Sequence, residues 1–356
     1  MRWFNYFVLF ILVITTISCS KKEKVKIAIM TKLSSASIVG SSEVNAGKMF
    51  MERHNITDID IYLYDDKWLP EESVKQFKKM REDGIDILIT SHVSGCVIAL
   101  EDMINTEGVF CFVTGATTDV ISNKDDLIFR NIQDVISEQY RIADYINERY
   151  NNILIIRDLD NFAYTEPALK YFTKKYKSNN FHLIDINISN LDYEIIRQKI
   201  EKLSFDSLYL LIGGYQVNAG NIAQLVHTVK PNTPVIYTPW MKSPTLLETA
   251  GKSIDSSVIA SHYPPYGESQ EIIDYLSEYQ NKFGELPTYI SLNVYTALEI
   301  IYEAIKKENK TPQTIKNYIL NKRKFNTRFG EIEFNEYGDI DSPLYFIDNI
   351  LKEFKK

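Results

Sequence analysis

From Lys24 onward the chain alternates short apolar runs rich in β-branched residues with longer amphipathic stretches, and this alternation limits the possible folds strongly. The pattern is typical of parallel sheets that are covered by helices on both faces. Helices are predicted at 42–54 and at 71–83, the second after Pro70, a residue favoured in a first helical turn. Strands are predicted in the first half at 25–30, 59–64, 85–90, 109–114 and 127–131.

The same alternation restarts near residue 153, so the sequence predicts a second unit of similar kind. A helix at 134–150 is expected to make the first crossing between the units. A second crossing is expected at 262–267, where Pro264 and Pro265 disfavour regular structure. Strands are predicted in this second half at 153–157, 182–188, 207–212, 235–238 and 258–261.

The predicted fold class is therefore α/β, with two doubly wound parallel-sheet lobes joined by a multi-strand hinge. Further helices are predicted at 270–283 and 289–307. Strands at 330–334 and 344–347 flank a turn and are expected to form a terminal ladder that returns to the other lobe. The expected first lobe comprises 25–133 plus 268–327, and the expected second lobe comprises 134–267 plus 328–356.

The first nineteen residues are read as a secretory signal rather than as part of the fold. Arg2 precedes an apolar run at 3–14, which is shorter than the roughly 20 residues that a membrane-spanning helix needs. The small residues that end at Cys19 resemble a bacterial lipobox, with Thr16 in place of the usual Leu. We therefore expect lipidation at Cys19, a polar tether at 20–24, and a protein anchored by lipid to a membrane in the periplasm or at the cell surface. An ordinary cleaved signal is the alternative.

Charge and composition argue against nucleic-acid binding and against catalysis. The net charge is -7, and no cluster of Lys or Arg lies outside the termini. Neither a Gly-x-Ser-x-Gly elbow nor a phosphate-binding loop is present, and the histidines lack metal-ligand spacing, so we expect no enzyme, cofactor or metal site. Cys96 and Cys111 are expected to be two buried thiols, although an oxidising compartment would allow them to pair.

Several short motifs occur in an order that resembles the type 1 periplasmic binding-protein family, and most closely its branch that binds branched-chain amino acids. The resemblance spans roughly 25–346, and its markers are Asp65-Asp66, 91–95, 114–118, Phe129-Arg130-Asn131, Gly213-Gly214-Tyr215, Tyr295-Thr296-Ala297 and 330–334. It implies a solute-binding lipoprotein of an ABC importer. Such a protein would bind a small carboxylate-bearing ligand, such as an amino acid or amide, in the inter-lobe cleft by hinge closure, with the ABC permease of the cytoplasmic membrane as partner.

Two loops of the first lobe are the candidate site for the ligand's carboxylate. Ser94 and Gly95 are predicted where a parallel strand leads into a helix, and so are Ala116 and Thr117. Backbone N–H groups at a helix N-terminus can hold a carboxylate without Arg or Lys. The resemblance implies that both loops do so. Alternatively, Ser94 and Thr117 only cap their own helices.

Aromatic residues of the second lobe are the candidates that close over the ligand. The resemblance implies ligand contacts from Tyr215, which follows two glycines, and from Phe162, which stands where relatives tend to carry Tyr. Trp240 could provide a flat apolar wall. For each of these rings, packing in the core is the alternative.

An acidic residue that pairs with the ligand ammonium in amino-acid-binding relatives is replaced here by Trp240-Met241-Lys242. Either Asp158 or Asp160 takes its place, or the ligand is not a free α-amino acid. The departure also leaves an alternative function open, that of a non-transport sensory or regulatory lipoprotein that uses the same fold for protein interaction. The two functions differ in whether a small molecule closes the lobes.

Overall fold

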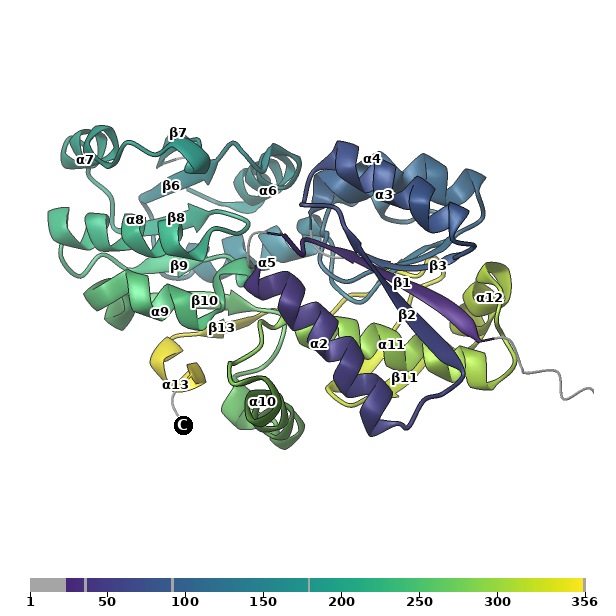
Figure 1. Cartoon of the computed structure of the whole chain (residues 1–356). Coiled ribbons are helices and arrows are strands. Elements are labelled where there is room, and N and C mark those ends of the chain that lie inside the picture. The colour runs from purple at the N-terminus through teal and green to yellow at the C-terminus, as the bar shows by residue number, and fades with distance from the viewer. Residues whose placement is uncertain (1–23, 35–36, 91–92, 179, 355–356) are drawn as a thin grey trace, which may run out of the picture.

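The computed structural model describes residues 24–34, 37–90, 93–178 and 180–354. They form two lobes that lie side by side, each built on its own sheet (Figure 1). The first sheet has the order β2-β1-β3-β4-β5 and is parallel throughout. Its strands are β1 (Val25–Thr31), β2 (Ile59–Asp65), β3 (Ile87–Thr90), β4 (Phe110–Val113) and β5 (Ile128–Arg130).

The second sheet has the order β13-β10-β9-β8-β6-β7, and only β13 runs antiparallel to its neighbour. The α/β class with two parallel-sheet lobes is thus confirmed. The strands of this sheet are β6 (Ile153–Asp158), β7 (Phe181–Ile186), β8 (Ser207–Leu211), β9 (Val235–Tyr237), β10 (Ser257–Ser261) and β13 (Tyr345–Ile347).

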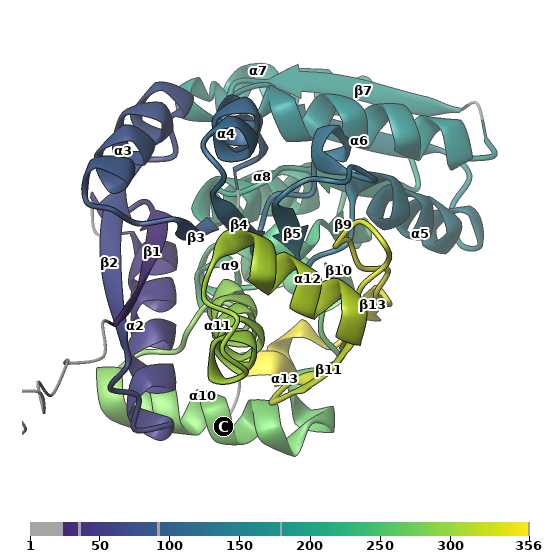
Figure 2. The same cartoon turned by 90° about the vertical axis from the view of Figure 1, so that its right-hand side faces the viewer.

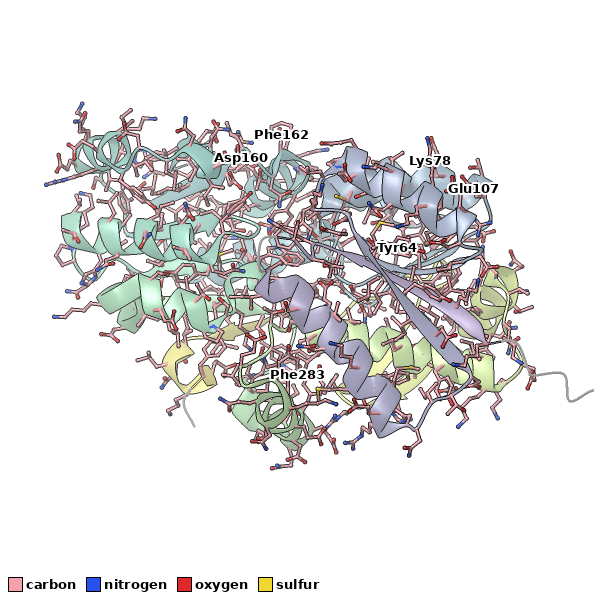
Figure 3. The ribbon with its side chains drawn as sticks, in the orientation of Figure 1. Tyr64, Lys78, Glu107, Asp160, Phe162 and Phe283 are labelled. Carbon is pink, nitrogen blue, oxygen red and sulfur yellow. The ribbon has the colours of Figure 1, made fainter. Side chains whose placement is uncertain are left out.

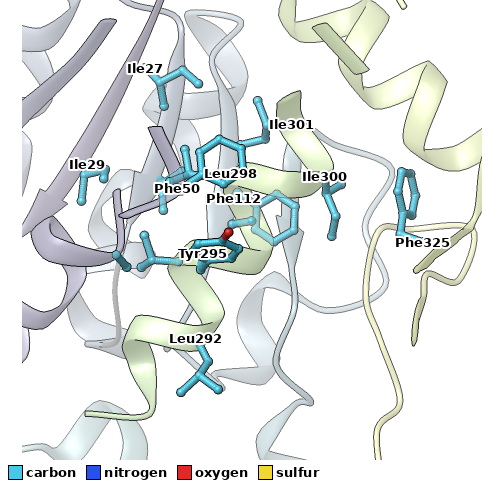
Figure 4. Packing of buried hydrophobic residues seen from close by; sticks show 14 of the residues in the cluster. Ile27, Ile29, Phe50, Phe112, Leu292, Tyr295, Leu298, Ile300, Ile301 and Phe325 are labelled. Carbon is cyan, nitrogen blue, oxygen red and sulfur yellow. The ribbon is translucent and has the colours of Figure 1, made fainter. Parts of the chain in front are cut away.

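The first sheet is covered on both faces, which explains why its strands read as continuous apolar runs. Ile27 and Ile29 of β1 pack on one face, in the same cluster as residues of α2 (Ile38–Arg53) and α11 (Ile290–Lys306) (Figure 4). Ala28 and Met30 point to the other face, which is covered by α3 (Pro70–Glu82) and α4 (Ser94–Thr106). Fully burying each large apolar side chain contributes about 1.5–3 kcal/mol, so both helical layers stabilise the lobe.

The second lobe, which lies behind the first in Figure 2, repeats this sandwich of helix, sheet and helix. Ile153 and Ile155 pack with α5 (Val135–Asn147) and α6 (Phe162–Lys175). Leu154 and Ile156 pack in the cluster of the opposite face. That face is covered by α7 (Tyr193–Glu201), α8 (Gln216–Val229) and α9 (Pro244–Ala250).

The chain passes between the lobes at the start of α5, between β10 and α10 (Gln270–Phe283), and between β12 (Gly330–Glu333) and β13. Asp134 caps α5, because its side chain accepts a hydrogen bond from the Ser137 N–H. The short 3₁₀ helix η5 (Tyr266–Glu268) follows the two prolines of the second crossing. The crossing predicted at 262–267 matches a connection between the two sheets, whereas the first crossing lies just before the predicted helix, because α5 itself packs in the second lobe.

The expected terminal ladder is wrong. β12 pairs with β11 (Lys324–Thr327), a strand that the sequence did not indicate, and β13 pairs with β10 instead. Phe325 and Phe334 are buried in the core of the first lobe, so residues 328–334 pack there and not with the second lobe as expected. The intervening segments are α12 (Pro312–Lys322) before β11 and α13 (Ile350–Phe354) after β13.

Cys96 and Cys111 are both buried and free, as expected. The expected signal at 1–19, the lipidation site Cys19 and most of the tether at 20–24 lie outside the described residues. Within the described residues, no helix is long and apolar enough to cross a membrane.

Candidate ligand-binding site

A cavity of about 770 Å³, including the solvent space at its mouth, opens between the two lobes. The first lobe contributes Val39, Trp68, Val93, Thr288, Tyr289 and Ile290 to its walls. The second lobe contributes Asp160, Asn161, the segment 213–216, Trp240 and Lys242. Most of these residues follow the carboxyl ends of β2, β3, β6, β8 and β9, the edge where open α/β sheets place ligands.

Tyr215 lines the cavity and is held in place by a tight turn. It caps α8 in a left-handed conformation, with φ of 55°. A side chain at Gly213 would place its Cβ 2.8 Å from Asn161 Nδ2 and 2.8 Å from Tyr164 Cδ1, so only glycine permits this close approach. Asn161 also donates a hydrogen bond of 3.1 Å to the Gly213 carbonyl. This loop therefore presents the half-exposed Tyr215 phenol to the cavity.

Trp240 lines the cavity and also packs between the lobes. Its ring centroid lies 5.9 Å from that of Tyr164, edge to face, and 6.1 Å from that of Tyr289 in the first lobe. The Gln216 side chain donates to the Trp240 carbonyl at 2.9 Å. Trp240 therefore has both of the roles considered for it: it forms part of the cavity wall, and it packs against Tyr164 and Tyr289.

Asp160 is the carboxylate that the second lobe presents to the cavity. Its oxygens accept hydrogen bonds from Asn187 Nδ2 at 2.8 Å and from the Ser189 N–H at 2.7 Å. Burial opposes ionisation, but these hydrogen bonds outweigh it and lower the pKa of Asp160. Asp160 is therefore an ionised acceptor for a cationic group.

Asp158, the other candidate acid, is fully buried and is not part of the cavity wall. One of its oxygens accepts the N–H groups of Asp160 and Ile188. Burial raises the pKa of Asp158 above its usual value. Of the two acids that the sequence offered, the structure brings Asp160 to the cavity and gives Asp158 a role in holding the loop.

Ser94 and Gly95 begin α4, beside the lining residue Val93. Val93 occupies the cap position and forms no side-chain cap hydrogen bond, so the idea that Ser94 caps its own helix is wrong. A Cβ at Gly95 would lie 3.6 Å from Pro70 and 3.7 Å from Ala163 of the second lobe. Gly95 is thus a point of close approach between the lobes, at the helix end that borders the cavity.

Ala116 and Thr117 differ from the expectation, because no α-helix follows β4. The chain continues into the 3₁₀ turn η1 (Asp119–Ile121), and Thr118 caps this turn by accepting from the Val120 N–H. Ala116 and Thr117 are fully buried, and the Thr117 carbonyl accepts the Val135 N–H at 2.7 Å. The segment leads directly from β4 toward β5, so no helix N-terminus is available at this position.

Phe162 is the first residue of α6 and is 53% exposed. Its ring centroid lies 6.0 Å from the Arg157 guanidinium, and it is not a wall residue of the cavity. Asp160 and Phe162 both lie at the end of the second lobe that is turned toward the first (Figure 3). Of the three aromatic residues predicted to contact the ligand, Tyr215 and Trp240 line the cavity, and Phe162 does not.

Sequence reasoning missed two aromatic wall residues, Trp68 and Tyr289. Trp68 follows β2 closely, with φ of 61°, and the Lys32 ammonium lies 5.1 Å from its ring centroid. The neighbouring Asp65-Asp66 marker at a strand's carboxyl end could have indicated it. Tyr289 precedes α11, and its partner Trp240 is in the other lobe. No local pattern encodes that contact.

Two parallel-sheet lobes with a cavity between the carboxyl edges of their sheets are the architecture of bilobal binding proteins. The chain belongs to the periplasmic binding protein family, whose model matches residues 24–348. The type 1 resemblance inferred from the motifs is confirmed. Membership in this family makes the chain a binding protein and not an enzyme.

Named relatives are similar over most of their length. The Leu/Ile/Val-binding protein of Escherichia coli (strain K12) is 22% identical over 289 residues, which is 79% of this chain and 77% of that protein. A leucine-binding protein from Thermotoga maritima has a TM-score of 0.80 at 16% identity, over 92% of this chain and 96% of that one. A solute-binding protein from Rhodopseudomonas palustris, solved with 3,4-dihydroxybenzoic acid, has a TM-score of 0.79 at 18% identity, over 91% and 92%. At these identities the solved structures establish a shared fold.

Proposed function

We propose that the protein is the solute-binding lipoprotein of an ABC importer, and that it holds a small carboxylate-bearing ligand such as an amino acid or amide. One observation carries the proposal. The cavity is walled by both lobes, with aromatic rings, the ionised carboxylate of Asp160 on the second lobe, and the start of α4, beside Val93, on the first. Relatives named for binding leucine, isoleucine and valine support an amino acid.

The two ends of such a ligand find complementary partners in the cavity. The first turn of α4 offers backbone N–H groups and a partial positive charge to the carboxylate, beside Val93. Asp160 offers its carboxylate to the ammonium or amide N–H groups. Tyr215 and Trp240 provide apolar faces for the rest of the molecule. Because it has this acid, the cleft fits an amine-bearing ligand better than a simple aromatic acid.

We expect the lobes to close on the ligand, because its carboxylate contacts the first lobe and its amine contacts the second. A ligand that binds first to the α4 end would draw the second lobe onto itself through Asp160 and Tyr215, and the permease would recognise the closed form. Differential contacts with the second lobe are what favour the closed state.

A thermal-shift screen against amino acids, their amides and hydroxybenzoates tests the proposal. A ligand at a hundredfold excess over its Kd stabilises the folded protein by about 2.7 kcal/mol, which raises the Tm. Asp160→Asn is expected to weaken amino acids about tenfold or more, since a charge-assisted contact is lost. The exposed Asp255, which lies outside the cavity wall, provides the control Asp255→Asn. Equal Kd values for both variants would contradict the assignment of Asp160.

We also propose that Cys19 is lipidated and anchors the protein to a membrane. The support is the lipobox-like sequence alone. Cys19→Ala should move the protein from the membrane fraction to the supernatant of a cell fractionation. Continued membrane association of this variant would instead indicate an uncleaved anchor.

A further inference from the structure

Lys242 stands where relatives were expected to carry an acid, and it is the one cationic side chain among the described residues that line the cavity. Its side chain is only 1% exposed. A buried ammonium needs compensation, because moving an isolated charge out of water is costly. The identity of its partner therefore determines what charge the cavity presents to a ligand.

The compensating charge comes from the C-terminal helix. Glu353 of α13 lies with its Oε2 2.7 Å from Lys242 Nζ, and the Glu353 side chain is 4% exposed. Lys242 Nζ also donates to Ser261 Oγ at 3.2 Å and lies 3.6 Å from the centroid of the Tyr266 ring. Two of the three donors of this ammonium therefore face Glu353 and Ser261, the Tyr266 ring covers it, and its charge is neutralised by the Glu353 carboxylate.

Glu353 is itself held firmly at this position. Both of its oxygens lie 3.2 Å from the Tyr266 backbone nitrogen, whose N–H they accept. Ile350 of the same helix is buried in the core of the second lobe, and the Phe354 ring packs edge to face on Tyr266. The helix thus fixes the carboxylate behind Lys242.

We propose that Glu353 is a specificity-determining residue that neutralises Lys242 and thereby makes the cleft select against anionic ligands. With Lys242 neutralised, Asp160 leaves the described cavity wall with an uncompensated negative charge. A monoanion is repelled by this wall, whereas a zwitterion gains from Asp160. The inference rests on the proposed function, because it assumes that the cleft binds a small solute.

Glu353→Gln tests the inference with a matched pair of probes, 4-hydroxybenzoate and 4-hydroxybenzamide. The variant keeps the side-chain shape and an acceptor for the Tyr266 N–H, but it removes the counter-ion of Lys242. Burial already lowers the pKa of Lys242, so in the variant only a ligand carboxylate can restore the charge pair. The Kd of the carboxylate is expected to fall about tenfold relative to that of the amide, because Lys242 gains an anionic partner only from the carboxylate. Isothermal titration of both probes against wild type and variant measures this ratio.

The double variant Lys242→Met, Glu353→Gln is the control, because it removes both charges at once. Replacing both members of a buried ion pair is usually tolerated, whereas removing one leaves an uncompensated charge. The double variant should keep the wild-type ratio of Kd values, and it can be measured even if Glu353→Gln does not fold. A shifted ratio in the double variant, or a folded Glu353→Gln protein that binds 4-hydroxybenzoate no more tightly than wild type, would overturn the inference.

Ligand binding to the wild-type protein tests the proposed function, and the ratio of the two probe Kd values tests the role of Glu353. If an amino acid stabilises the wild-type protein but Glu353→Gln does not change the ratio of the probes, the function stands and the role of Glu353 is refuted. If no amino acid, amide or hydroxybenzoate binds the wild-type protein, the proposed function fails. In that case, tight carboxylate binding by Glu353→Gln alone would still show that Glu353 masks Lys242.

Discussion

Burial sets the ionisation of single residues where α5 meets the second crossing between the lobes. The Glu138 carboxylate in α5 accepts hydrogen bonds from Tyr164 Oη at 2.8 Å and Gln139 Nε2 at 3.0 Å, and lies 3.5 Å from His262 Nε2. Burial raises the pKa of Glu138 to about 7. Burial also lowers the pKa of His262 to about 3, so the imidazole is neutral at neutral pH. This cluster joins the first crossing between the lobes to the second.

Glu138→Gln should change how stability depends on pH. The folded-state pKa of Glu138, about 7, lies above its ordinary value of 4.5, so its contribution to stability is present below pH 4.5 and is lost as pH rises through 7. The variant lacks this dependence, and its stability relative to wild type should rise by on the order of 3 kcal/mol between pH 4.5 and 8. Urea denaturation across that range measures the difference. Parallel curves for the two proteins would contradict the raised pKa.

Gly95→Trp should abolish ligand binding and leave the first lobe folded. Even a Cβ at this position would lie 3.7 Å from Ala163, so an indole would hold the lobes apart and obstruct the end of α4. Gly95→Ala is the matched control, because its added methyl meets Pro70 and Ala163 at ordinary contact distance. Titration of both variants should show binding only for the alanine. Binding by Gly95→Trp with wild-type Kd would refute this position for the site.

Among the elements, the helix pair α8 and α9 shows how closely the second lobe is packed beside the cleft. A Cβ at Gly220 would lie 2.1 Å from Thr249 Oγ1 and 2.9 Å from the Ala250 nitrogen. The hydroxyl can move, but the backbone atom cannot move without shifting α9. Because α8 begins at the cavity residue Gln216, this contact also positions part of the site.

Gly220→Ala should therefore destabilise the protein, although alanine favours helix more than glycine does. The expected loss is about 1–3 kcal/mol, the usual cost of overpacking a tight contact. Thr228→Ala at an exposed position of the same helix should change stability by less than about 0.5 kcal/mol. Chemical denaturation of both variants provides the test, and a Gly220→Ala protein as stable as wild type would show that the helices can separate at little cost.

The elements that the sequence predicts well are those with strong local patterns. Helix 270–283 was predicted with its observed bounds, and β1 within one residue, because amphipathic periodicity and a continuous apolar run define them. β11 was missed because its sequence, Lys324–Thr327, has one buried residue, Phe325, and depends on long-range packing. The helix expected after Ala116 and Thr117 failed for a similar reason, since the chain's return to β5 decides that segment.

For the candidate site, the expectation that ligands bind at the carboxyl ends of parallel strands located Tyr215, Trp240 and Asp160 near the cavity. It could not show which of Asp158 and Asp160 points outward, because that depends on the Asn187 and Ser189 hydrogen bonds from the neighbouring strand end. The pairing of Lys242 with Glu353 also joins residues more than a hundred positions apart in the chain. Tertiary contacts of this kind carry no local signature.

In the molecule as a whole, side-chain contacts tie together the crossings that connect the two lobes. Arg141 of α5 donates to the Ser342 carbonyl at 2.5 Å and pairs with Asp341 at 2.7 Å, which joins the first crossing to the last. Tyr171 of the second lobe donates to Asp119 of the first at 2.5 Å. The lobes therefore touch through this hydrogen bond, and through the Trp240 and Tyr289 rings at the cavity, as well as at the crossings. This arrangement fits a hinge whose closed form is stabilised by contacts across the cleft.

Distance measurement across the cleft tests the central claim most directly. Spin labels on the exposed positions Ile98 in the first lobe and Ile195 in the second, introduced as Ile98→Cys and Ile195→Cys, can be followed by pulsed EPR. Cys96 and Cys111 are buried, which should keep them from reacting with the label. Adding the amino acid that most raises the Tm should replace a broad distance distribution by a narrower and shorter one. An unchanged distribution across all tested ligands would contradict capture by lobe closure and favour a sensory or regulatory role through protein interaction.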